Sequence, residues 1–320
     1  MSIHQHVDEL DGLPVFEFPP ATAGTALPEP GAVAWRLSVD PYDDSDEETF
    51  AERWQRFTET VELSGVRALV LGQWGEAYEE SASTVVEAVV AAKDRLTSLR
   101  AVFLGDLTME ESEISWIQQS DVTPLLTAFP DLRSLSVRGS DGLAFPPVRH
   151  EALRELRFES GGLPAAVVRG ICESDLPALE SLTLWLGVPD YGGDYEVSDL
   201  AAVLAGGRFP ALRHLGLQNS AIQDEIATAV AAAPVVAGLE TLDLSMGTLT
   251  DSGAEALLGG QPLTHLRRLD LDHHYLTGAM VQRIRQALEP SGVEVVADEQ
   301  GDEDVDGDDG TVWRYAAVTE

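Results

Sequence analysis

Acidic and imidazole side chains that could bind a metal ion or exchange protons gather in the last third of the 320-residue chain. They are His214, Asp243, Asp270, Asp272, His273 and His274. A metal site needs several ligands that converge on one point, whereas neighbouring residues on a strand point to opposite faces. We therefore expect no metal and no other cofactor. A small-molecule- or metal-dependent accessory enzyme, with its site near His214, Asp243, Asp270 and Asp272, is kept as the alternative function.

Two further patterns copy parts of known sites. Ser245, His214 and Asp243 could be drawn as a nucleophilic triad, but no loop that would supply oxyanion donors is recognisable. The stretch 302–307, with the pattern D-x-D-x-D-G, copies the first half of a calcium loop. The twelfth position of that loop should be a bidentate Glu, and it is Trp313. We therefore expect a charged spacer here and no catalytic residues.

The elements that would position these side chains follow from an internal repeat. The pattern L-x-x-L-x-L, with other apolar residues at some places, occurs eight times at steps near 27 residues. It begins at positions 66, 99, 132, 153, 179, 212, 239 and 266. A degenerate earlier unit covers 33–39, and a last strand covers 293–296.

Each repeat contains one strand and one helix. The alternating L-x-L has the period of a strand with one buried face, and the residues after it have apolar side chains three to four apart, as in a helix. The clearest helical stretches are 222–230, 251–258 and 280–288. One such unit cannot bury its own apolar face, so we expect the units to stack into a right-handed α/β solenoid, with parallel strands on the concave side and helices on the convex side.

These residues resemble leucine-rich repeats, and the 27-residue units with helical backs are most similar to the ribonuclease-inhibitor type. The best example runs from Leu239 to Gly260. The family has Asn or Cys at the ninth place of the repeat, where its side chain bonds backbone. That place holds Gly161, Gly187, Ser220, Gly247 and His274 here. We expect His274 to bond backbone instead. The whole chain also resembles a set of uncharacterised bacterial cytoplasmic leucine-rich-repeat proteins, which implies a binding role.

The end pieces differ from the repeats in composition. Residues 1–30 are rich in proline and read as an extended N-terminal lead-in, and 31–65 as an N-terminal cap with a degenerate repeat. A capping box at Ser45–Glu48 would open the cap helix. The solenoid then covers 66–296, an acidic linker 297–311, and a docked C-terminal segment 312–320.

Composition narrows the class of partner. The chain has 55 acidic and 20 basic residues, a net charge of −35, so it is repelled by nucleic acid and by anionic lipid. A single cysteine suits a reducing compartment. The N-terminus lacks the pattern of a signal peptide, and no run approaches the length of a membrane helix. We expect a cytoplasmic protein that binds neither nucleic acid nor membrane. The oligomeric state does not follow from the sequence.

The third, fifth and seventh places of successive repeats would form rows on the concave face. Their side chains do not serve the core, so they could bind a ligand. The candidate partner-binding residues are Phe103, Arg138, Glu155, Arg157, Glu159, Trp185, His214, Asp243, Asp270 and Asp272. An exposed Trp185 beside Arg138 and Arg157 has the composition of an interface hot spot. Alternatively, Trp185 packs onto the 191–194 loop and the Arg and Glu side chains neutralise one another.

We therefore predict a non-enzymatic scaffold that binds another protein on its concave face. The acidic residues towards the C-terminal end of that face would favour a basic partner.

Overall fold

The computed structural model describes residues 3–42, 48–305 and 311–320. The chain divides into two compact units, from Met1 to Glu159 and from Ser160 to Thr319.

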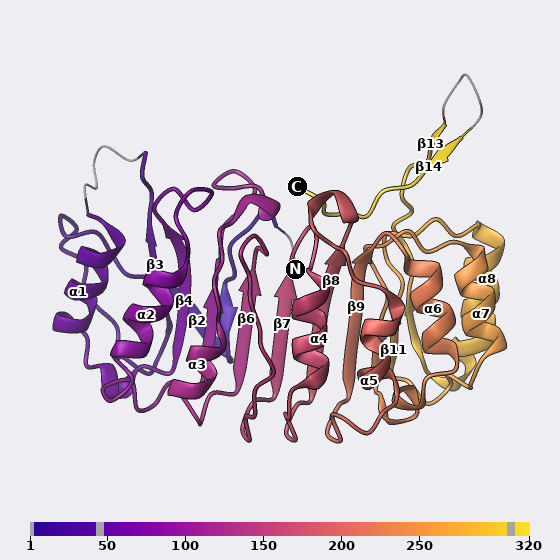
Figure 1. Cartoon of the computed structure of the whole chain (residues 1–320), viewed down its shortest axis with the longest axis horizontal. Coiled ribbons are helices and arrows are strands. Elements are labelled where there is room, and N and C mark those ends of the chain that lie inside the picture. Colours follow the sequence, from indigo (N-terminus) through magenta and orange to yellow (C-terminus); the bar gives the residue numbers. More distant parts are fainter. Residues whose placement is uncertain (1–2, 43–47, 306–310) are drawn as a thin grey trace. The chain divides into compact units, whose positions relative to one another are not determined.

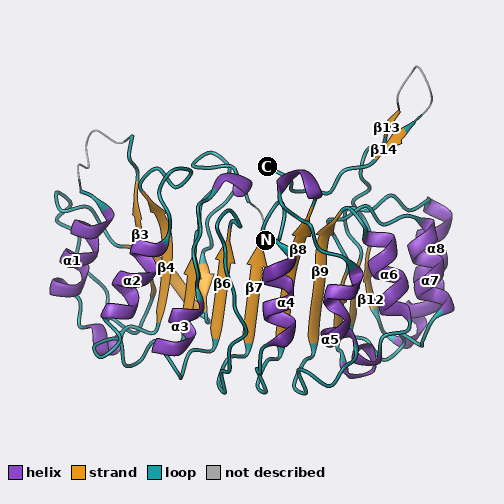
Figure 2. Cartoon of the chain, viewed as in Figure 1, coloured by secondary structure: helices purple, strands orange, loops and turns teal. Residues whose placement is uncertain are grey.

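Unit 1 is a sheet with helices on one face (Figures 1 and 2). Its strands are β1 (Glu9–Leu10), β2 (Leu13–Glu17), β3 (Ala34–Val39), β4 (Ala68–Trp74), β5 (Ala101–Leu104), β6 (Ser134–Arg138) and β7 (Glu155–Glu159). Its helices are α1 (Phe50–Thr60), α2 (Ser83–Ala91) and α3 (Thr123–Ala128), with short 3-10 helices at Leu63–Gly65 and Ile114–Trp116. β1 pairs antiparallel with β2, and each later strand pairs parallel with the one before it.

Unit 2 has the same layering. Its parallel strands are β8 (Ser181–Gly187), β9 (His214–Ser220), β10 (Thr241–Asp243), β11 (Arg268–Asp270) and β12 (Glu294–Val296). Its helices are α4 (Ala165–Glu173), α5 (Ala201–Leu204), α6 (Gln223–Ala231), α7 (Asp251–Gly259) and α8 (Gly278–Leu288), with 3-10 helices at Pro189–Tyr191, Val197–Leu200, Pro234–Gly238 and Glu289–Ser291. β13 (Asp304–Val305) and β14 (Val312–Trp313) form an antiparallel hairpin.

The strand register confirms the predicted repeat and the α/β solenoid class. The second leucine of each pattern lies beside its counterpart in the next repeat, as in Leu69, Val102 and Leu135 of unit 1. Leu215 and Leu242 do the same in unit 2, and all of these side chains are buried. The predicted helical stretches are also confirmed, because they coincide with α6, α7 and α8.

Aspartate side chains supply part of the backbone bonding that the asparagine ladder would give. Asp224 accepts hydrogen bonds from Thr250 N (2.8 Å), Thr250 Oγ1 (2.5 Å) and Gly253 N (3.1 Å), which start the helix of the next repeat. Asp251 accepts the same pair of bonds from Thr277, at 2.8 Å each. The expectation for His274 is confirmed: it is buried, and its Nδ1 accepts from Leu276 N at 3.1 Å.

The N-terminal cap helix is positioned by aromatic packing. α1 begins after Thr49, which forms a reciprocal capping box with Glu52. The box expected at Ser45 lies outside the described residues. Phe57 of α1 packs edge-on against Trp35 of β3, with ring centroids 5.5 Å apart, and so covers the first repeat strand. None of the helices in the described part of the chain is both long and apolar enough to cross a bilayer.

Candidate functional site

The helix-free face of each sheet, which carries the third, fifth and seventh places of the repeats, is called its open face. In unit 1 the part of this face on β3 to β5 is covered by N-terminal residues of the chain itself. Val7 and Leu13 are buried in one cluster with Ala68, Val70 and Phe103, and Leu10 and Val15 pack against it. The lead-in expected to be extended therefore forms strands β1 and β2 and an N-terminal cover, residues 3–18.

Phe103 is only 1% exposed beneath this cover. We expected Phe103 to be available to a partner, and in the structure it is part of the core. The reason is the run of small and apolar residues at the start of the open face, which gives the N-terminal cover an apolar surface on which to pack.

Asp106 fastens the N-terminal cover to the sheet. It follows β5, is fully buried, and accepts a hydrogen bond from Val7 N at 3.2 Å. Its other carboxylate oxygen bonds Arg36 of β3 and lies 3.5 Å from His6 Nδ1. Arg36 also bonds Glu17 of β2, with Nε and Oε2 2.8 Å apart. A buried carboxylate is stable only with such partners, so the cover and the sheet depend on one another.

His6 is held in its charged form. Burial lowers the pKa of His6, but hydrogen bonds to Asp106 and Glu111 outweigh burial and raise the pKa to about 9. His6 and Glu111 line a cavity of about 510 Å³ in unit 1, together with Glu17, Arg36 and Arg53. The arginines in this cavity are already bonded, Arg36 as above and Arg53 to the Ser38 carbonyl.

The row of buried charges continues along the open face of unit 1. Arg138 of β6 is fully buried and donates from Nε to Glu159 Oε2 at 2.7 Å. Arg157 of β7 bonds the other oxygen of Glu159 at 2.5 Å. Burial raises the pKa of Glu159, but the charges of Arg157 and Arg138 outweigh it and hold that pKa low.

The expected accessibility of Arg138 and Glu159 is therefore wrong, because they neutralise one another inside the protein. This is one of the two alternatives that the sequence left open. Glu155 remains exposed, and the Arg157 side chain is 17% exposed.

Trp185 is also buried, with no exposed surface, so the exposed aromatic anchor expected on this strand is absent. Its indole Nε1 donates to Gln218 Oε1 of β9 at 3.0 Å. Gln218 Nε2 in turn donates to Asp243 Oδ2 and Ser245 Oγ, at 2.8 Å each. The residue beside Trp185 in the register thus satisfies its polar atom, which permits full burial.

The candidates on β9 to β11 remain accessible. His214, Asp243, Asp270 and Asp272 are all partly exposed on or beside the open face of unit 2. The register places Thr241 between His214 and Arg268, and Asp243 beside Asp270. This part of the face is therefore a continuous polar surface.

Asp243 and Asp270 lie opposite one another on neighbouring strands. Burial raises the pKa of Asp243, and the charge of Asp270 raises it further, against a hydrogen bond from Ser245. Asp270 is paired with Arg268, with Oδ2 and Nη2 2.6 Å apart. Adjacent carboxylates repel, so a cation placed between them is stabilised.

The geometry bears on both catalytic alternatives. His214 Nε2 lies 3.2 Å from Thr183 Oγ1, and Ser245 Oγ donates directly to Asp243 Oδ1 at 2.6 Å, so a Ser–His–Asp relay is not formed. Across the described ranges of the chain, no group of three or more His, Cys, Asp or Glu side chains is placed to hold a metal ion.

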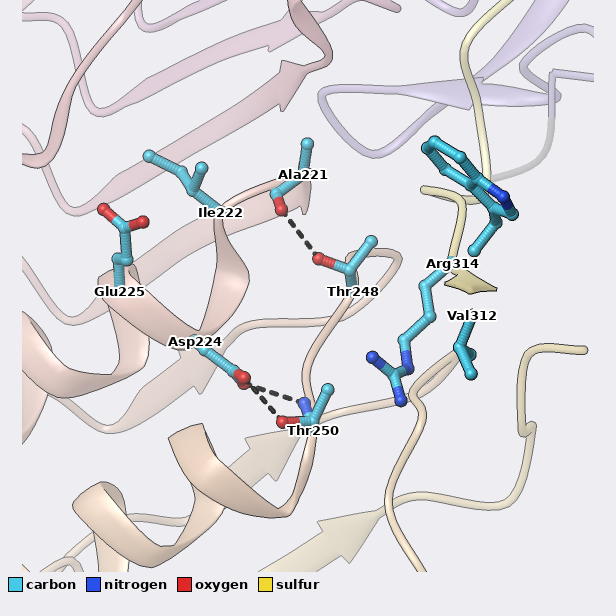
Figure 3. Close-up of a pocket in the computed structure, with 9 residues that line it drawn as sticks. Ala221, Ile222, Asp224, Glu225, Thr248, Thr250, Val312 and Arg314 are labelled. Carbon is cyan, nitrogen blue, oxygen red and sulfur yellow. Dashed lines mark hydrogen bonds between the residues drawn. The ribbon is translucent and has the colours of Figure 1, made fainter. Parts of the chain in front are cut away.

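A second cavity, of about 350 Å³, lies beside α6 in unit 2 (Figure 3). One wall carries Ala221, Thr248 and the Asp224–Thr250 bonds, and the other carries Val312 and Arg314 from the C-terminal segment. Thr248 Oγ1 donates to the Ala221 carbonyl at 2.9 Å.

Sequence reasoning did not identify His6, Arg36 or Asp106. Asp106 stands two places after the strand of its repeat and belongs to no motif. The available signal was an arginine, Arg36, in a degenerate repeat made mostly of apolar residues, at the fifth place, where the register sets it beside Val70.

Comparisons with known proteins agree with this architecture. A leucine-rich-repeat family profile matches residues 239–258, which span β10 and most of α7. A protein from Bacteroides fragilis with a solved crystal structure is similar over 89% of this chain and 76% of its own, with 28% sequence identity and a TM-score of 0.76. No curated protein matches the chain. Residues 239–258 are thus a leucine-rich repeat, and each unit, taken by itself, has the architecture of a leucine-rich-repeat solenoid.

Proposed function

We propose that the chain is a non-enzymatic protein-binding scaffold and that its partner contacts the open face of unit 2. The leucine-rich repeat supports a role in protein interaction at the level of the fold. The observation that favours unit 2 is the difference between the two open faces. The N-terminal cover occupies the β3 to β5 part of that of unit 1, whereas His214, Thr241, Asp243, Arg268 and Asp270 remain partly exposed in unit 2.

The charges of this surface favour a basic partner. Asp243, Asp270 and Asp272 outnumber Arg268. Burial is the largest cause of the raised pKa of Asp243, and repulsion from the negative charge of Asp270 raises that pKa further. A lysine or arginine side chain of the partner would relieve the repulsion between the carboxylates of Asp243 and Asp270. Charge complementarity of this kind contributes mainly to specificity and to the association rate.

The proposal is tested by capture from the cytosol of the source cells with matched variants as bait. Thr241→Arg places a bulky cation in the middle of the open face of unit 2. Gln282→Arg adds the same side chain at an exposed position of α8, on the opposite layer. We expect Thr241→Arg to reduce the captured partner about 10-fold, equal to about 1.4 kcal/mol, and Gln282→Arg to leave it unchanged.

A third bait, Glu155→Arg, examines the part of the open face of unit 1 that stays exposed. Loss of capture with Glu155→Arg, combined with normal capture by Thr241→Arg, would move the binding surface to unit 1. Equal capture by all three baits would reject the open faces altogether. Thermal midpoints equal to that of the unmodified chain show that each bait is folded.

A further inference from the structure

The C-terminal segment of unit 2 packs along a row of three turns that occupy equivalent positions in successive repeats. The first lies at the end of β9, and the other two follow β10 and β11; each contains a non-glycine residue with a left-handed backbone: Asn219 (φ 57°), Met246 (φ 67°) and His273 (φ 53°). They are 27 residues apart, so they occupy the same place in successive repeats. Left-handed non-glycine residues are uncommon, and three at one repeat position indicate a shared role.

The turns bind the backbone of the segment Tyr315–Val318. Asn219 Oδ1 accepts from Val318 N at 2.9 Å, and Asn219 Nδ2 donates to Val318 O at 2.5 Å. The Met246 carbonyl accepts from Ala317 N at 2.8 Å. The Tyr275 hydroxyl accepts from Tyr315 N at 2.9 Å and donates to Tyr315 O at 2.8 Å.

Asn219 and Tyr275 each pair with both backbone groups of one residue, as a neighbouring strand would. Such contacts recognise an extended peptide by its main chain, and pockets for alternate side chains add selectivity. Ala316 and Val318 are the segment residues that are buried. The turns therefore form a peptide clamp, defined as Asn219, Met246, His273 and Tyr275.

The aromatic side chains that precede Ala316 are exposed. Trp313 and Tyr315 are 55% and 53% exposed, and the cavity of Figure 3 separates Val312 and Arg314 from Thr248. The connection from β12 carries eight acidic residues between 298 and 309.

We propose that the peptide clamp also binds the C-terminal segment of a second copy of this chain. The second copy presents the same residues, so the exchange forms the same bonds and needs no new surface, which makes it a low-cost route to a dimer. Eighteen residues, 297 to 314, connect the last repeat to the segment, and they include the β13–β14 hairpin, which must open for the connection to reach its full length of about 60 Å. This self-association is independent of the partner surface proposed on the open face.

The test mixes two full-length variants that are defective in complementary ways. Asn219→Gly removes the side chain of the clamp but keeps the left-handed backbone, and its own segment is intact. Ala317→Pro removes the N–H that bonds Met246, and its clamp is intact. In sedimentation velocity we expect each variant alone to be monomeric. We expect their equimolar mixture to contain at least about 10-fold more dimer, in a 1:1 ratio of the two chains.

A matched control keeps the N–H in place. Ala317→Gly retains the donor, so its clamp stays occupied, and its mixture with Asn219→Gly should show no such increase. A mixture of Asn219→Gly and Ala317→Pro that sediments as the average of its components would overturn the proposal. If Asn219→Gly lowers the thermal midpoint strongly, Tyr275→Phe replaces it, because it removes both bonds to Tyr315 and keeps the ring. Adding Thr241→Arg to both chains should leave the heterodimer unchanged.

Discussion

Replacing Asp106 with Ala removes the buried carboxylate that joins the N-terminal cover to the sheet, and so tests how much this carboxylate contributes to stability. The carboxylate is fully buried, and its loss leaves the Arg36 guanidinium, whose side chain is 6% exposed, without its buried partner. Breaking a buried ion pair by removing one member typically costs about 3–5 kcal/mol. Arg36 keeps its bond to Glu17 at 2.8 Å, so we expect the lower end, about 3 kcal/mol.

The assay is urea denaturation followed by circular dichroism, with Asp131→Ala as the matched control. Asp131 also pairs with an arginine of unit 1, Arg100, but its side chain is 73% exposed and the atoms are 3.7 Å apart. An exposed pair of this kind contributes ~0–1 kcal/mol. Hydrogen exchange provides a local readout, since the Val7 amide donates to Asp106 and should exchange faster in Asp106→Ala. Equal losses of stability in the two variants, with unchanged exchange at Val7, would refute the buried-charge account.

Three further changes probe other parts of the chain. The folded-state pKa of His6, about 9, lies above its ordinary value of 6.5. The stabilising contribution of His6 is therefore fully present below about pH 6.5 and is lost as pH rises through 9. His6→Gln should remove this pH dependence from the unfolding free energy, and an unchanged pH profile would count against the hydrogen bonds of His6. Asp224→Ala removes three hydrogen bonds to the next repeat and should cost about 1.5–3 kcal/mol in urea denaturation, while loss of the adjacent exposed Glu225 should cost nothing measurable. Trp185→Phe leaves the buried Gln218 oxygen without its indole donor and should cost about 1–3 kcal/mol, so an unchanged urea midpoint would contradict the bond.

The parts of the fold that repeat were predictable from sequence. The spacing of Leu215, Leu242 and Leu269 determines both the strands and their register, because each residue must face the same core as its counterpart one repeat away. The helices after these strands were predictable because the spacing of apolar residues changes from two in the strands to three or four in the helices. The local sequence pattern was sufficient to predict the structure wherever one repeat packs on the next.

The candidate site was less predictable, because burial on the open face depends on segments distant in sequence. Phe103 is covered by Val7 and Leu13, about 90 residues away along the chain, and no pattern near Phe103 indicates this. The same holds for Trp185, whose indole is satisfied by Gln218 of the next strand. Alternation predicted which face each side chain occupies, but it contains no information on what covers that face.

Hydrogen exchange measured with and without the captured partner tests most directly which open face is used. We expect binding to slow exchange in peptides containing β9, β10 and β11, and to leave residues 3–18 and strands β4 and β5 at their rates in the free protein. Slower exchange confined to β4 and β5, together with faster exchange of residues 3–18, would show that the partner displaces the N-terminal cover and would contradict the assignment to unit 2.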